Sequence, residues 1–299
     1  MAEHRTAHDA AEVITSRDNR WVKMFRAGLR GAEPAADQAI AVEGPKLIED
    51  ALRHGLEADA LMVSESAERF MEPILRAASA SEAGIARSRV FRTTDKIFEG
   101  LSGTEAPQGV AALFRQPAWD FEDLLRGSRT SAETNGNSGV AALVVVLAGV
   151  QDPGNVGTAL RSAEAFGATG VVAARGTADP WSPKAVRASA GSALRLPVLR
   201  GIAVPVLLTQ LRVSKIQVIA AGTESSAGGG RAGVAAAPDL RGACAIFIGS
   251  EGAGLPHEVE TAADARMAIP MAKSVESLNA GVAASILLYE AARQRMKRA

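Results

Sequence analysis

The sequence predicts an α/β protein built from two domains. Stretches typical of strands and of helices alternate along most of the 299 residues, the order expected of α/β folds. Residues 143–150 form a continuous apolar run, as in a strand buried on both faces of a parallel sheet. Residues 116–140 are polar, rich in Ser, Asn and Gly towards their end, and without a periodic pattern.

These observations set the expected domain boundaries. We expect a flexible tail over residues 1–14, a first α/β domain over 15–115, a linker over 116–140 and a second domain over 141–299. Trp119, Phe121 and Leu124 could dock a short helix at the start of the linker.

The first domain begins with a helix at residues 19–29, which the glycines at 28 and 31 and the turn around Pro34 end. Pro45 suits the first turn of the next helix. The remaining pattern predicts strands at 39–42, 60–64, 89–92 and 109–114, and helices at 45–53, 67–78 and 95–101.

The second domain repeats the alternation. Strands are predicted at 143–150, 170–173, 216–221, 243–248 and 265–269, and helices at 155–166, 184–190, 204–212 and 278–297. Residues 227–237 are rich in Gly and Ala and are predicted to be a surface excursion.

Composition excludes several classes of protein. A single cysteine excludes a disulfide framework, and four scattered histidines provide no metal-ligand cluster, so we expect no metal. No run approaches the roughly 20 apolar residues that span a bilayer, and no secretory h-region is present. We therefore expect a cytoplasmic protein without a membrane partner.

Basic residues gather locally although the formal net charge is zero. Between Asp179 and Glu224 the chain holds only basic charges, and a second basic group recurs at helical spacing over residues 17–30. A third closes the chain at residues 293–298. Any one of these groups would be interpreted as the solvated face of a helix. Three such groups in a neutral protein favour a polyanionic partner.

Polar residues then follow three predicted strands. Asn155 and Arg161 lie at the start of the helix after the buried strand; Asn155 suits a helix N-cap, and Arg161 offers a fork of donors for a phosphate. Glu251 stands in the glycine-rich loop 249–254, and Ser277 and Asn279 begin the last helix, with Ser277 as its expected N-cap. Ligands of open α/β sheets bind at the carboxyl ends of strands, so we place the site there.

In this order, the three segments resemble the SpoU/TrmH family of RNA ribose 2′-O-methyltransferases in the SPOUT class. The first matches the family's N-x-G-x-x-x-R motif at Asn155, Gly157 and Arg161. The second matches G-S-E-x-x-G-L at Gly249, Ser250, Glu251, Gly254 and Leu255. The third matches I-P-M…S-L-N at Ile269, Pro270, Met271, Ser277, Leu278 and Asn279. The resemblance covers residues 141–299.

A looser resemblance covers the first domain. Residues 43–46 and 107–110 are similar to the substrate-binding domain of many of these enzymes, a small α/β fold like that of ribosomal proteins that bind RNA bends.

The resemblance implies a parallel sheet with a deep trefoil knot, which periodicity cannot predict. It implies S-adenosyl-L-methionine as cofactor, bound near Thr223, Gly249, Ile269, Met271 and Leu278. It implies catalytic roles for Arg161, Asn155, Glu251, Ser277 and Asn279. Arg161 would anchor an RNA phosphate and stabilise the developing alkoxide. Its proposed role as base is disfavoured because a guanidinium keeps its proton, and Glu251 is the second candidate for proton acceptor. Such enzymes work as homodimers through the C-terminal domain, with Arg161 serving the partner's cofactor site.

The function implied is methylation of a ribose 2′-hydroxyl in structured RNA, with ribosomal RNA preferred because the first domain adds a second grip on a folded loop. Transfer RNA ribose methylation, RNA base methylation and a non-catalytic RNA-binding protein on the same fold remain open. A phosphate-binding nucleotide enzyme is disfavoured, because the 249–254 loop lacks the Lys and Ser/Thr of a G-K-[ST] motif.

Overall fold

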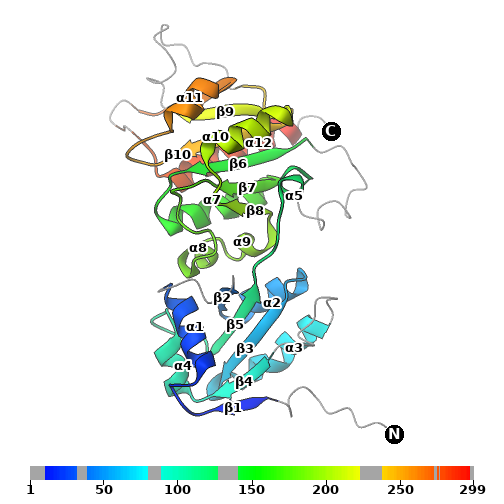
Figure 1. The fold of residues 1–299 in the computed structure, drawn as a ribbon, viewed down its shortest axis with the longest axis vertical. Helices are drawn as coiled ribbons and strands as arrows, with labels where there is room; N and C mark the ends of the chain where they lie inside the picture. The colour runs from blue at the N-terminus through cyan, green and yellow to red at the C-terminus, as the bar shows by residue number, and fades with distance from the viewer. Residues whose placement is uncertain are drawn as a thin grey trace. The chain divides into compact units, whose positions relative to one another are not determined.

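The computed structural model describes residues 11–31, 39–79, 89–126, 141–222, 238–272, 275 and 277–296. Its contacts divide the chain into two compact units, residues 1–118 with 181–183, and residues 119–180 with 184–299 (Figure 1). The second unit therefore starts inside the predicted linker, where helix α5 (Phe121–Arg126) buries Leu124 completely against the C-terminal sheet. Residues 127–140 of that linker and the predicted excursion at 227–237 lie outside the described residues.

The N-terminal unit contains a five-stranded mixed sheet. Its order is β1 (Glu12–Ile14), β4 (Arg89–Thr93), β3 (Ala58–Ser64), β5 (Val110–Arg115) and β2 (Ala39–Glu43). Strand β5 runs antiparallel to both of its neighbours. The expectation of a tail through residue 14 is wrong for 12–14, because β1 pairs with β4 and Ile14 is buried.

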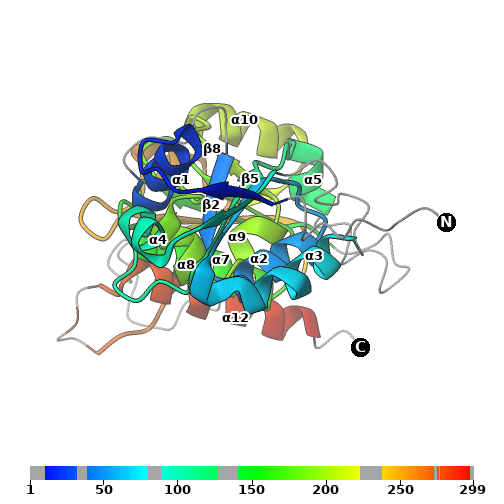
Figure 2. The same cartoon turned by 90° about the horizontal axis from the view of Figure 1, so that it is seen from below.

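Helices cover both faces of this sheet (Figure 2). On one face, α1 (Arg20–Arg30) and α4 (Asp95–Leu101) pack Phe25 and Phe98 against Phe91 of β4. The other face carries α2 (Pro45–Arg53) and α3 (Met71–Ser79), the latter preceded by the short 3₁₀ helix η2 (Glu65–Phe70). This unit is the predicted small α/β domain.

The C-terminal unit contains a six-stranded sheet in which every pairing is parallel. Its order is β11 (Ala265–Ala268), β9 (Gln217–Gly222), β10 (Cys244–Gly249), β6 (Leu143–Ala148), β7 (Gly170–Ala173) and β8 (Val198–Arg200). The predicted parallel sheet is confirmed, and the apolar run of β6 is buried along its length because the strand lies in the middle of the sheet.

Two helical layers enclose the parallel sheet. One consists of α5, α10 (Val204–Val213) and α11 (His257–Ala262), packed on Val144, Val146 and Phe247. The other consists of α7 (Pro153–Ala165), α9 (Ser192–Arg195) and the long α12 (Ala280–Met296), with α8 (Pro183–Ala188) against α7. The trefoil knot stays a prediction.

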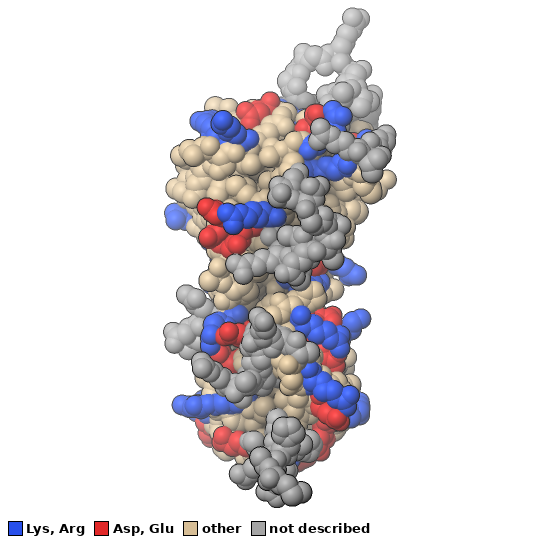
Figure 3. Space-filling view, turned by 90° about the vertical axis from the view of Figure 1, so that its right-hand side faces the viewer, with Lys and Arg blue, Asp and Glu red and all other residues tan. Residues whose placement is uncertain are grey.

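The basic groups of the sequence largely serve the fold. Arg26 and Arg30 donate to the carbonyl of Gly100 in α4, at 3.2 and 2.9 Å, where a helix end favours a cation. Lys184 and Arg200 pair with Asp152 and Asp179 at 2.8 Å. On the face drawn in Figure 3, basic and acidic side chains are interspersed. These basic side chains therefore have partners within the fold and do not by themselves indicate a polyanionic partner.

Arg295 of α12 holds the amino-terminal edge of the parallel sheet. Its guanidinium donates to the carbonyls of Ala141, Ala142, Leu240 and Gly242, at 2.6, 3.0, 2.8 and 2.7 Å. These carbonyls precede β6 and β10, and Cys244 at the start of β10 is fully buried. Burial is the main cause that raises the pKa of the Cys244 thiol.

We expect Arg295→Ala to lower the free energy of unfolding by about 2 kcal/mol, because charge-assisted hydrogen bonds are lost. Calorimetry of the full chain should show the transition of the C-terminal unit about 6 °C lower. The matched control is Arg293→Ala, since Arg293 pairs only with Glu290 of the same helix at 2.6 Å among the described residues. Equal shifts for both variants would refute this role of Arg295.

Candidate active site

The site lies where the two central strands of the C-terminal sheet end. Strands β6 and β10 are parallel neighbours in register up to their last residues, with Ala148 opposite Gly249. The chain after β6 enters α7, and the chain after β10 enters the glycine-rich loop. The first two motifs are therefore brought together by the register of one strand pair.

The glycine-rich loop closes on itself. The backbone of Ser250 and Gly254 forms a reciprocal pair, with N···O distances of 3.2 and 3.0 Å. A Cβ at Gly249 would stand 2.2 Å from the carbonyl of Gly254, so only glycine allows this closure. Glu251 follows at the exposed tip of the loop.

Asn155, Glu251 and Asn279, one from each motif, form a continuous hydrogen-bond network. The amide Nδ2 of Asn155 donates to Oε1 of Glu251, and its Oδ1 accepts from Nδ2 of Asn279 at 2.7 Å. Oε1 of Glu251 also accepts from the backbone N–H of Ala280 at 3.2 Å. Both asparagine amides are thus fixed in orientation, and the loop is tied to the starts of α7 and α12.

The helix caps differ from the sequence expectation. Asp152, rather than Asn155, caps α7, accepting from the N–H of Gly154 at 2.7 Å. The hydrogen bond from Lys184, followed by that from Gly154, lowers the pKa of the Asp152 carboxyl. Asn279, rather than Ser277, caps α12, because its Oδ1 accepts from the N–H groups of Gly281 and Val282 at 3.0 and 3.2 Å. Because Asp152 caps α7, the side chain of Asn155 does not cap this helix.

Beside this network lies a cavity of about 480 Å³ at the carboxyl ends of β9, β10 and β11. Predicted site residues in its wall are Gly249, Glu251, Ile269, Met271, Ser277 and Leu278. Its charged wall residues in the described part of the chain are the carboxylates Glu251 and Glu260, with no lysine or arginine. The wall therefore favours a ligand that carries positive charge and apolar groups.

Sequence reasoning missed part of this wall. Glu260, Met267 and Leu287 line the cavity although no motif singled them out. Leu255 and Gly222 also contribute, the first within the second motif and the second directly before Thr223. Thr223 itself lies outside the described residues.

Arg161 stands apart from the cavity of its own chain. It projects from α7 as an exposed side chain, is absent from the cavity lining, and makes no hydrogen bond or ion pair with any residue that the structure describes. Its helix is held closely on both sides: a Cβ at Gly157 would meet Ala188 of α8 at 2.6 Å, and one at Gly281 would meet Thr158 at 2.9 Å. Arg161 is an available guanidinium on a fixed helix.

Comparison with known proteins matches both units of the chain to known protein families. Residues 142–289 match the SpoU rRNA Methylase family, and residues 34–112 match the MRM3-like substrate binding domain. An uncharacterised tRNA/rRNA methyltransferase of Mycobacterium tuberculosis is 33% identical over 283 residues, covering 92% of this chain and 80% of that one. The 23S rRNA (guanosine(2553)-2′-O)-methyltransferase RlmP of Bacillus subtilis is 29% identical over 277 residues, covering 92% and 97%.

Among solved structures, an AdoMet-bound rRNA methyltransferase from Sinorhizobium meliloti superposes with a TM-score of 0.74 at 28% identity, covering 95% of this chain and 98% of that one. The fold and these matches together define an RNA methyltransferase. The chain belongs to the SpoU rRNA methylase family.

Among the residues that the structure describes, no group of three or more His, Cys, Asp or Glu side chains is placed to hold a metal ion. None of the helices described combines the length and the apolar character that crossing a bilayer requires.

Proposed function

We propose that this protein transfers a methyl group from S-adenosylmethionine to a ribose 2′-hydroxyl of ribosomal RNA. The observation that carries the proposal is the hydrogen-bonded convergence of Asn155, Glu251 and Asn279 beside a largely apolar cavity that also carries two carboxylates.

The cavity fits the cofactor in size and in charge. Its volume of about 480 Å³ lies in the usual range of small-molecule sites. Ile269, Met271 and Leu278 offer apolar surface for an adenine ring, and Glu251 and Glu260 suit the positive charge of a sulfonium and an ammonium group. A phosphate-bearing nucleotide would instead meet two carboxylates. The bound cofactor supplies an activated methyl group.

Arg161 anchors a phosphate of the RNA and stabilises the alkoxide that develops at the 2′-oxygen. A guanidinium keeps its proton, so it acts through charge and hydrogen bonds rather than as a base. The new C–O bond forms as the C–S bond breaks, and the hydroxyl proton leaves. Oε1 of Glu251 already accepts two hydrogen bonds, so Oε2 is our candidate to receive this proton.

The active form is a homodimer that pairs C-terminal units. An apolar row on α12 supports this assembly: Val282, Ile286 and Tyr289 are 44%, 40% and 52% exposed and recur at helical spacing. The position of Arg161 outside its own chain's cavity supports its supply to the cavity of the partner.

Ribosomal RNA is the preferred substrate class for two reasons. The chain matches the 23S rRNA methyltransferase from Bacillus subtilis along 97% of that protein's length. The N-terminal unit also matches a substrate-binding domain. The relative from Mycobacterium tuberculosis carries both tRNA and rRNA in its name, so transfer RNA ribose methylation is the second candidate.

The test is methyl transfer from labelled S-adenosylmethionine to unmodified ribosomal and transfer RNA transcripts, followed by nucleoside analysis. We expect label in a 2′-O-methyl nucleoside of ribosomal RNA. Label only in transfer RNA would move the substrate to the second candidate, and label in a base would overturn ribose methylation. Measured cofactor binding without label in any RNA would favour the non-catalytic reading.

A further inference from the structure

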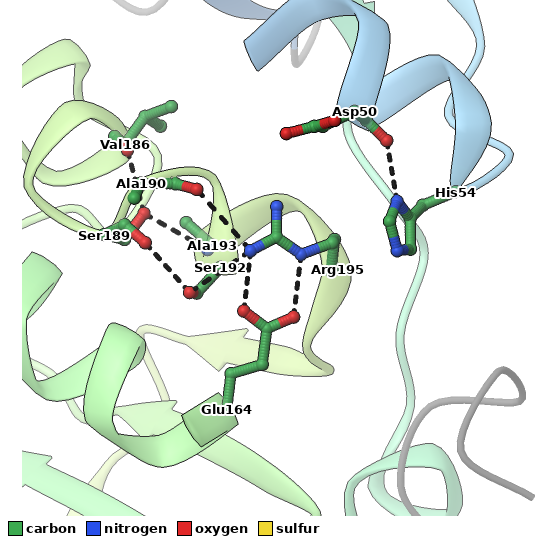
Figure 4. Close-up of polar contacts among 9 residues, drawn as sticks. All are labelled: Asp50, His54, Glu164, Val186, Ser189, Ala190, Ser192, Ala193 and Arg195. Atoms are coloured by element: carbon green, nitrogen blue, oxygen red, sulfur yellow. Dashed lines mark hydrogen bonds and ion pairs between the residues drawn. The ribbon is translucent and has the colours of Figure 1, made fainter. Parts of the chain in front are cut away.

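Glu164 lies on α7 three residues after Arg161, the spacing at which a helical arginine and carboxylate pair with each other. That local pair is absent. Instead, both carboxylate oxygens of Glu164 accept from Arg195 of α9, Oε1 from Nε at 2.7 Å and Oε2 from Nη2 at 2.6 Å (Figure 4). Arg161 has no partner among the described residues.

Arg195 is held in place for this contact. Its side chain is 16% exposed, against 34% for that of Glu164. Its Nη2 also approaches the carbonyl of Ala190 and the hydroxyl of Ser192, each at 3.5 Å. Ser192 in turn donates to the carbonyl of Ser189 at 2.8 Å, so the turn before α9 is internally braced (Figure 4). A planar, bidentate arginine in such a setting outcompetes a flexible exposed one for the same carboxylate.

We propose that Arg195 is a positioning residue for methyl transfer, which sequesters Glu164 and thereby leaves Arg161 available to an RNA phosphate. This inference rests on the proposed role of Arg161. Without Arg195, Glu164 would present an unpaired carboxylate one turn from Arg161. It would compete with the phosphate for the guanidinium and repel the RNA backbone.

The competition has a kinetic signature. Saturating RNA displaces Glu164, so the loss of Arg195 raises KM for RNA while kcat is retained. An exposed ion pair is a weak competitor, and the expected rise in KM is about two- to fivefold. The cofactor Kd stays unchanged, because neither Glu164 nor Arg195 lines the cavity.

The experiment compares Arg195→Met, Glu164→Gln and the double variant in steady-state methylation of the RNA substrate, using full-length protein. Methionine retains an apolar stem where the arginine stem packs. We expect Arg195→Met to raise KM, Glu164→Gln to leave it near the wild-type value, and the double variant to return KM to within about twofold of wild type. Glu164→Gln breaks the same ion pair, so structural damage from the loss of that pair would raise KM in this variant as well.

A matched control is Arg241→Met. Arg241 forms a bidentate pair with Asp239 at 2.8 Å, ahead of the amino end of β10 and so away from the site. The KM of the Arg241→Met variant for RNA should equal that of the wild-type protein. A double variant with a KM as high as that of Arg195→Met would overturn the inference while the proposed function stood. Full activity of Arg161→Ala would instead overturn the role of Arg161 on which the inference rests.

Discussion

Arg161→Ala is expected to lower kcat for methyl transfer by about 10²–10³-fold, the usual loss when one preorganised donor to a developing oxyanion is removed. The ribose hydroxyl is a weak nucleophile, so the alkoxide character of the transition state needs a nearby positive charge. In the described ranges the cavity wall offers only carboxylates as charged groups, which leaves Arg161 as the candidate for that charge.

The measurement should separate catalysis from binding and folding. S-adenosylmethionine affinity should be unchanged, because Arg161 does not line the cavity of its own chain. The matched control is Arg212→Ala, an exposed arginine of α10 on the opposite face of the sheet. A kcat within about threefold of wild type for Arg161→Ala would remove this arginine from the chemistry.

The elements predicted correctly from the sequence are those long enough to show a clear apolar pattern. The apolar run of β6 predicted the buried centre of a parallel sheet, and the second and third motifs supplied most of the cavity wall. Strands β1 and β8 were missed, because each has three residues, too few to establish a period of two. One edge strand of each sheet was therefore missed, whereas the opposite edge strands, β2 and β11, were predicted.

Side-chain pairing was the least predictable level. Asn155 satisfied every sequence criterion for a cap, yet Asp152 three residues earlier takes that role. Pro153 occupies the first turn of α7, so the Asp-Pro pair was a signal in the sequence that could have placed the cap at Asp152. The pair between Glu164 and Arg195 joins residues 31 positions apart, and Arg195 belonged to what read as a basic cluster for RNA. Long-range ion pairs of this kind become visible only once the helices are packed.

Two inactive variants are expected to restore activity when they share a dimer. The first is Arg161→Ala, which keeps the cavity. The second is Leu278→Asp, which places a carboxylate on the apolar wall of the cavity and abolishes cofactor binding while Arg161 remains. Co-expression with different affinity tags allows the mixed dimer to be isolated.

If Arg161 serves the partner's cavity, the mixed dimer has one complete site. The Arg161→Ala chain contributes the intact cavity and the Leu278→Asp chain contributes the arginine, so about half of the wild-type activity is expected from a two-fold dimer. If Arg161 served its own cavity, neither site would be complete and activity would stay at background. Background activity in a mixed dimer that binds one cofactor would thus refute supply in trans, and a monomer by sedimentation would refute the dimer itself. Recovery of methyl-transfer activity in the mixed dimer would show that Arg161 of one chain completes the active site of the other chain.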